Sequence, residues 1–223
     1  MTDREQAAEH LRVIRSLMQR ATVYRAISWP TALFGGSLAL ALAVLLFFRE
    51  RAAISGGGLE VDRMSEAAWV VCWLVALAVT GSFNAVLIAR KAQREEGRFF
   101  SPGLKMALRA LIPPMVAGAV VGIPMAILST AAEAAAVWVV FYGLALLATA
   151  GFAPKSIPRL GWVCLVFGLA AFLYAHGGFD LPGLGPPART ESPMLEANLI
   201  MGSAFGVFHL VYALLVAARK TND

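Results

Sequence analysis

The chain is organised as six apolar stretches separated by shorter polar segments. The stretches cover residues 29–48, 67–89, 106–128, 133–152, 159–175 and 195–217. Each is close to the ~20 residues that an α-helix needs to cross ~30 Å of hydrocarbon. We therefore expect an all-α fold in which residues 29–217 form a polytopic membrane bundle of six transmembrane helices.

Residues 1–28 precede the first stretch and carry a different pattern. Thr2 and Glu5 have the spacing of a capping box, and Leu11, Ile14 and Leu17 recur at helical spacing. This predicts a cytoplasmic amphipathic helix that lies in the headgroup layer or against the bundle. It is either a topological anchor or a partner-binding surface. The candidate lipid or partner contacts here and in the second loop are Arg12, Arg15, Arg20, Arg94 and Arg98.

Lys and Arg residues alternate between the segments that connect the stretches. One side collects Arg4, Arg12, Arg15, Arg20, Arg25, Arg90, Lys91, Arg94, Arg98, Lys105, Arg109, Lys155, Arg159, Arg219 and Lys220. Of the 19 Lys and Arg, only Arg49, Arg51, Arg63 and Arg189 lie on the other side. Because basic loops stay in the cytoplasm, this pattern predicts that both termini, including the tail 218–223, are cytoplasmic.

Composition agrees with a membrane protein. The 223 residues are 59% hydrophobic and 15% charged, which is too apolar for a soluble domain. The net charge of +5 comes from residues that flank the spans, so we expect contact with anionic lipid headgroups and not with nucleic acid. Cys72 and Cys164 fall inside predicted spans and are expected to be buried apolar side chains.

Few polar side chains enter the spans, and the last span holds the most informative group. Asn198, Gly202, Gly206 and His209 are spaced to share one helix face. The two glycines permit a close backbone approach, and the two polar side chains can hydrogen-bond across it, within the protomer or across a homo-oligomer. Asn84 in the second span is a candidate partner of His209. These groups serve either packing or proton or substrate transfer.

Two further seams of small residues predict close helix packing. Gly118 and Gly122 are four apart in the third span, and Gly35, Ala39 and Ala43 form a stripe in the first. Tight internal packing explains both seams without a pore.

Few sequence patterns indicate catalysis or cofactor binding. Glu95-Glu96 and the pair Phe205 and His209 are similar to fragments of CAAX-type intramembrane proteases, but the arginine after the paired glutamates and the second histidine motif are missing. The three histidines are not paired in facing spans, as a bis-haem carrier would require. We expect no enzymatic activity, no cofactor and no metal.

The N-terminal region resembles a family of uncharacterised bacterial integral membrane proteins. The resemblance is carried by residues 14–20 (IRSLMQR), residues 24–28 (YRAIS) and Gly35-Gly36, and covers about the first forty residues. Members have an I-R-x-L/M-M-E/Q-R stretch before their first span. The resemblance implies a bacterial inner-membrane protein whose neighbouring gene encodes a small winged-helix regulator.

A second resemblance is to ABC-2-type permeases. These also have six spans, cytoplasmic termini and a charged coupling segment between spans two and three. Residues 94–97 (REEG) followed by Ser101-Pro102 are similar to that segment, with Arg98 where the permeases carry threonine. This resemblance implies a cytoplasmic ATPase as partner.

The sequence therefore predicts a non-enzymatic inner-membrane protein, a sensor or scaffold that binds a cytoplasmic partner. The alternative is a transport subunit, either an ABC-2-like permease or a small carrier.

Overall fold

The computed structural model describes Gln6, Glu9 and residues 29–55, 62–94, 102–176 and 192–220. Within these ranges the chain is helical and contains no strand. The elements are α2 (Trp29–Ser55), α3 (Glu66–Arg94), α4 (Pro102–Leu128), α5 (Ala131–Leu147), α6 (Ser156–Ala175), α7 (Pro193–Met201), the π-helical turn η1 (Gly202–Val207) and α8 (Phe208–Lys220). The prediction of an all-α bundle is confirmed. The predicted N-terminal helix 1–28 lies outside the described residues, apart from Gln6 and Glu9.

The helices have the length and composition of membrane spans. Five helical segments are long and apolar enough to cross a bilayer, with α7, η1 and α8 acting as one continuous segment, and α5 is a shorter apolar helix of 17 residues. Large apolar side chains face outward, where lipid replaces water as the surrounding medium. The chain is a multi-pass membrane protein.

The fourth helix ends earlier than its apolar stretch predicted. The expected span 133–152 is wrong at its end, because α5 stops at Leu147. The buried Thr149 donates a hydrogen bond from Oγ1 to the Leu146 carbonyl over 2.6 Å, and its own carbonyl accepts from the Phe152 and Ala153 amides. These bonds close a turn, so residues 148–152 connect α5 to α6 and do not extend the helix.

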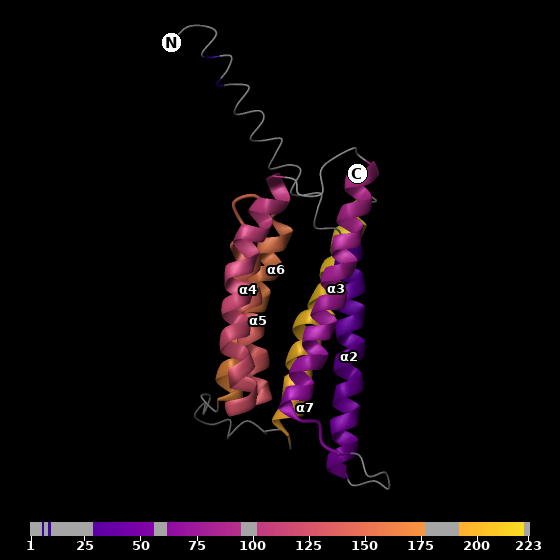
Figure 1. The fold of residues 1–223 in the computed structure, drawn as a ribbon, viewed down its shortest axis with the longest axis vertical. Coiled ribbons are helices and arrows are strands. Elements are labelled where there is room, and N and C mark those ends of the chain that lie inside the picture. The colour runs from indigo at the N-terminus through magenta and orange to yellow at the C-terminus, as the bar shows by residue number, and fades with distance from the viewer. Residues whose placement is uncertain are drawn as a thin grey trace.

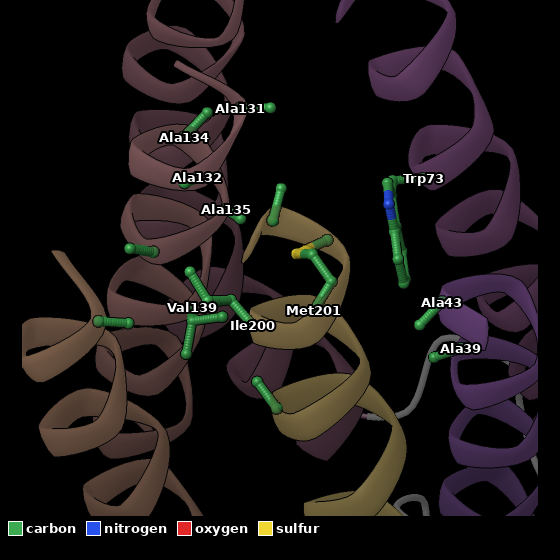
Figure 2. Close-up of a cluster of buried hydrophobic side chains, with 14 of the residues drawn as sticks. Ala39, Ala43, Trp73, Ala131, Ala132, Ala134, Ala135, Val139, Ile200 and Met201 are labelled. Carbon is green, nitrogen blue, oxygen red and sulfur yellow. The ribbon is translucent and has the colours of Figure 1, made fainter. Parts of the chain in front are cut away.

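The helices form two groups (Figure 1). One group contains α4, α5 and α6, and the other contains α2, α3 and the α7–η1–α8 segment. The groups meet chiefly where α5 packs on α7. In Figure 2, Ile200 and Met201 of α7 lie between the alanine-rich face of α5 and Trp73 of α3.

Glycines set the closest helix contacts in each group. Between α5 and α6, a Cβ built on Gly143 would lie 2.7 Å from the Leu165 amide nitrogen, and one on Gly168 would lie 2.8 Å from that of Val140. Between α2 and η1, a Cβ on Gly202 would lie 2.8 Å from the Ala43 Cβ, and one on Gly206 would lie 3.0 Å from the Leu40 Cβ. Only residues without a side chain allow backbones to come this close.

The predicted seams therefore exist, each with its own partner. Gly202 and Gly206 pack on α2, where the stripe residue Ala43 meets Gly202. Gly35 faces Thr80 of α3. Gly118 and Gly122 of α4 receive the side chains of Phe141 and Trp138 of α5.

Candidate functional site

A cavity of about 270 Å³ lies between the two groups of helices. Its wall combines residues from α2, α3, α4, α5, α6 and the α7–η1–α8 segment, so it exists only in the assembled bundle. No described residue that lines it is charged. Seven of its lining residues carry aromatic rings: Trp73, Trp138, Phe141, Tyr142, Phe205, His209 and Tyr212.

His209 lies on the cavity wall with both ring nitrogens engaged. Nδ1 lies 2.9 Å from the Ala204 carbonyl, and Nε2 lies 2.6 Å from the Tyr142 hydroxyl oxygen. A carbonyl can only accept, so Nδ1 carries the proton and, in the neutral ring, Nε2 accepts from the tyrosine O–H. Phe205 packs against both rings, with centroids 5.0 Å from Tyr142 and 6.1 Å from His209. The hydrogen bond joins α8 to α5, one helix from each group.

The expected pairing of Asn84 with His209 is wrong. Asn84 Oδ1 accepts a hydrogen bond from Thr31 Oγ1 over 2.9 Å, which links α3 to the beginning of α2. Thr31 is itself a cavity-lining residue. Asn84 therefore holds α3 against α2, and the partner of His209 Nε2 is the Tyr142 hydroxyl.

Asn198 of α7 is fully enclosed by protein. Its Oδ1 accepts from Trp69 Nε1 of α3 over 2.9 Å, while its Nδ2 has no hydrogen-bond partner among the described residues. The Trp69 ring in turn stacks on Trp138 of α5, with centroids 5.4 Å apart and planes 9° apart. This chain of contacts connects α7, α3 and α5.

The four residues predicted to share one face of the last span do not meet one helix. The glycines face α2, Asn198 bonds to α3 and His209 bonds to α5. For His209 the cause is η1, where the Phe208 amide bonds to the Ser203 carbonyl five residues back. The extra residue in this turn rotates everything after it by about 100°, the angle of one residue in a 3.6-residue turn.

Two indole N–H groups near the cavity find no hydrogen-bond acceptor in the described part of the chain. They belong to Trp73 and Trp138, both of which line the cavity. The Trp138 nitrogen lies against α4, where a Cβ added at Gly122 would clash with it. Trp73 is 5% exposed, and a buried donor without an acceptor costs free energy. Both indole nitrogens have almost no accessible surface, so they are enclosed by protein even though their rings line the cavity.

At the end of the bundle opposite Arg94, polar side chains form hydrogen bonds that connect or cap the ends of helices. Glu133 accepts from Ser129 and pairs with His176 Nδ1 at 3.2 Å, which ties the start of α5 to the end of α6. Glu50 is 4% exposed and accepts from Ser192, the N-cap of α7. Among the described residues no three His, Cys, Asp or Glu come close enough to hold a metal ion.

The remaining candidates are peripheral. Arg94 is exposed at the end of α3, while Arg12, Arg15, Arg20 and Arg98 lie outside the described residues. Cys164 is buried, Cys72 is partly buried, and both are free thiols.

Sequence reasoning missed Tyr142, Trp69 and Trp73, the residues that organise the polar part of the core. A signal for them exists, because Trp and Tyr in membrane proteins concentrate at the two interfaces. Tyr142 and Trp73 lie well inside their helices, where the hydroxyl and the indole N–H need internal partners.

Comparison with known proteins adds no family to this picture. No protein-family model matches the chain, and searches of curated proteins and of solved structures give no match either.

Proposed function

We propose that this chain is a non-enzymatic sensor of the bacterial inner membrane that binds a small apolar molecule in its cavity and signals to a cytoplasmic partner. The observation that carries the proposal is the cavity itself, which lies where the two helix groups meet. A molecule bound there touches both groups, so it can favour one relative arrangement over another. Such differential contact is what a ligand needs in order to shift a conformational equilibrium.

The proposal includes an orientation. Basic residues gather at one end of the helices, as in Arg90 and Arg94 of α3, Lys105 and Arg109 of α4, and Arg219 of α8. The positive-inside rule assigns this end, and with it both termini, to the cytoplasm. Arg94 and the predicted basic helix 1–28 would then present the contacts for anionic lipid and for a partner.

A labelling experiment tests the orientation. Ser55 and Gln93 are exposed at opposite ends of the bundle. In a variant without Cys72 and Cys164, a cysteine at Ser55 should react with an impermeant thiol reagent applied to spheroplasts, and one at Gln93 should not. Labelling of Gln93→Cys from outside would contradict the proposed orientation.

A pair of variants on α3 tests ligand binding. Ala76 lines the cavity, whereas Ala78 is exposed on the outside of the same helix. A ligand that binds the folded state raises the unfolding temperature in a saturable manner. The probes are uncharged ring compounds of about ten heavy atoms, a size scaled from a cavity of about 150 Å³ that holds benzene. The rise in unfolding temperature that they cause should be lost in Ala76→Phe and kept in Ala78→Phe. Equal responses of the two variants would contradict the proposal.

The second candidate is a transport subunit, which the two-group architecture favours. The groups join mainly through α5 and α7, and a rocking motion about that contact would open the cavity to one side and then the other. Purification in mild detergent separates the candidates, because a co-purifying ATPase supports the transport subunit and a co-purifying DNA-binding regulator supports the sensor. The resemblances to ABC-2 permeases and to the bacterial membrane-protein family suggest these two partners.

A further inference from the structure

A second space, apart from the central cavity, lies between α6 and α8. It is a groove of about 240 Å³ that is open on one side. Among the described residues, only Leu160 and Tyr212 line both the groove and the central cavity. Because α6 belongs to one helix group and α8 to the other, a molecule in the groove contacts both groups.

Most of the groove has apolar walls. On α8 its lining residues Phe208, Val211, Leu215 and Arg219 recur at spacings of three and four, so they form one stripe along the helix. This stripe is about 16 Å long at ~1.5 Å per residue. One leaflet contributes about 15 Å of the ~30 Å of hydrocarbon. The groove therefore has the length of an acyl chain within one leaflet.

One end of the groove is basic. Arg159 comes from the first turns of α6 and Arg219 from the last turn of α8, and both line the groove. No acidic residue lines it in the described part of the chain, and neither arginine forms an ion pair with a described residue. The two positive charges therefore lack a counter-charge among the described residues.

The beginning of α6 adds to this positive end. Its first turn contains no acidic residue, and the N-cap Lys155 makes no capping hydrogen bond with its side chain. The amides at a helix start carry partial positive charge and favour an anion. Ser156, in this turn, also lines the groove and offers a hydroxyl. Guanidinium groups, a hydroxyl and a helix N-terminus together are suited to a phosphate group.

The combination of a basic end and an apolar groove selects among possible occupants. A role in membrane topology accounts for arginines at helix ends, but it requires no groove beside them. Residues 1–28 of this chain carry five arginines against three acidic residues, so they are repelled by Arg159 and Arg219. A small soluble anion would leave the apolar walls without contacts. A phospholipid with a negative headgroup matches both parts.

We propose that the groove between α6 and α8 is a binding site for one anionic phospholipid, whose phosphate lies at Arg159, Arg219 and Ser156 and whose acyl chain follows the apolar stripe of α8. Basic pockets between transmembrane helices are a recognised place for such headgroups. This inference goes beyond the proposed function and does not depend on it. The bound lipid connects the two helix groups at the end where their arginines would otherwise repel each other.

Charge substitutions test the polar end of the site. The full chain in mild detergent is titrated with phosphatidylglycerol or with zwitterionic phosphatidylcholine, and native mass spectrometry gives the dissociation constant of the first bound lipid. We expect the wild type to prefer phosphatidylglycerol. Arg159→Gln and Arg219→Gln should each weaken its binding by about fivefold, the value of one basic residue near an anionic lipid. Arg109→Gln, which removes an exposed arginine of α4 outside the groove, should keep the wild-type affinity.

A matched pair of variants on α6 tests the apolar part. Val163 lines the groove, whereas Val166 on the same helix does not, and both are exposed. In Val163→Trp the larger side chain occupies the groove, so the affinity for phosphatidylglycerol should fall, while Val166→Trp should bind it as the wild type does. Glycerol 1-phosphate, a headgroup without acyl chains, should not displace the lipid.

Three results would overturn the lipid site. An equal loss of affinity in Arg109→Gln and Arg159→Gln would mean general attraction to a basic surface. Equal affinity of the wild type for the two lipids would remove the role of charge. Displacement by glycerol 1-phosphate, together with undiminished lipid binding in Val163→Trp, would mean a phosphate site without an acyl-chain groove. The response of Ala76→Phe and Ala78→Phe to ring compounds tests the central cavity separately, so each proposal can fail without the other.

Discussion

The helices α5 and α3 face the same cavity from opposite sides, yet they are held in different ways. Ten residues of α5 are buried, and its backbone touches that of α6 at Gly143. Among the described side chains of α3, only Trp69, Val70 and Trp73 are buried. A Cβ added at Gly81 of α3 would meet no atom of the described residues within 4 Å.

This contrast assigns different roles to the two walls. Small residues let α5 and α6 approach until their backbones touch. Because this close packing holds the two helices together, separating them is costly in free energy. The contacts of α3 are made by side chains. Trp69 holds its beginning, and Thr80 packs against Gly35 of α2 further along. The Thr31–Asn84 bond and the Phe34–Phe83 ring stack hold α3 to the beginning of α2. We infer that α5 and α6 form a rigid frame and that α3 is the wall that moves when a molecule enters.

Adding one methyl group at Gly143 should destabilise the packing of α5 on α6. In Gly143→Ala the new Cβ would lie 2.7 Å from the Leu165 amide nitrogen and 2.8 Å from the Gly161 carbonyl oxygen, neither of which can rotate away. We expect a loss of about 1–3 kcal/mol, the usual cost of overpacking. Unfolding in a denaturing detergent series measures it.

The matched control is the same substitution on the movable wall. Gly81→Ala adds its methyl group to open space, so its free energy of unfolding should stay within about 0.5 kcal/mol of the wild type. Equal losses in the two variants would mean that α5 and α3 do not differ in the way that we infer.

A smaller effect is expected where η1 meets α2. In Gly206→Ala the nearest atoms are Leu40 Cβ at 3.0 Å and Leu40 Cα at 3.1 Å, so the neighbour has to yield by only a few tenths of an ångström. We expect a loss of about 1 kcal/mol, at the low end of overpacking costs. Leu199→Ala is the control, because Leu199 is 51% exposed toward lipid. A larger loss in Leu199→Ala than in Gly206→Ala would contradict the seam.

The fold was predictable because lipid imposes a simple rule on every span. A helix must be apolar over its whole crossing length, and six such stretches could be counted from the sequence. Small-residue seams were predictable for the same reason, since without a hydrophobic force between helices the close contacts gather at glycine and alanine. Gly143, Gly161 and Gly168 follow this pattern too, and the seven-residue spacing of the last two was a signal for the α5–α6 seam.

The site was not predictable to the same degree. Spacing assigns Asn198 and His209 to one face only if the helix between them is regular. The π-helical turn η1 breaks that regularity, although residues 202–207 contain no proline that would predict it. Which helix receives a seam also depends on tertiary arrangement, so the pairing of His209 with Tyr142 could not be read from either span alone. The cavity is a further step removed, because it is the space that six helices leave between them.

The smallest expected effect concerns the hydrogen bond between the two helix groups, Tyr142 to His209. Tyr142→Phe removes the hydroxyl and leaves His209 Nε2 without its donor at 2.6 Å, while the ring contacts with Phe205 remain. Hydrogen bonds between helices in another membrane protein average about 0.6 kcal/mol and reach about 1.7, because the unfolded chain in the membrane also finds partners. A double-mutant cycle with His209→Phe isolates this coupling from the packing of the two rings. We expect a coupling energy of about 0.6 kcal/mol, well below the loss in Gly143→Ala. A coupling near zero would mean that the two groups are held together by the α5–α7 contact alone, whereas a coupling as large as the Gly143→Ala loss would make this bond, and not the α5–α6 seam, the principal restraint on the cavity.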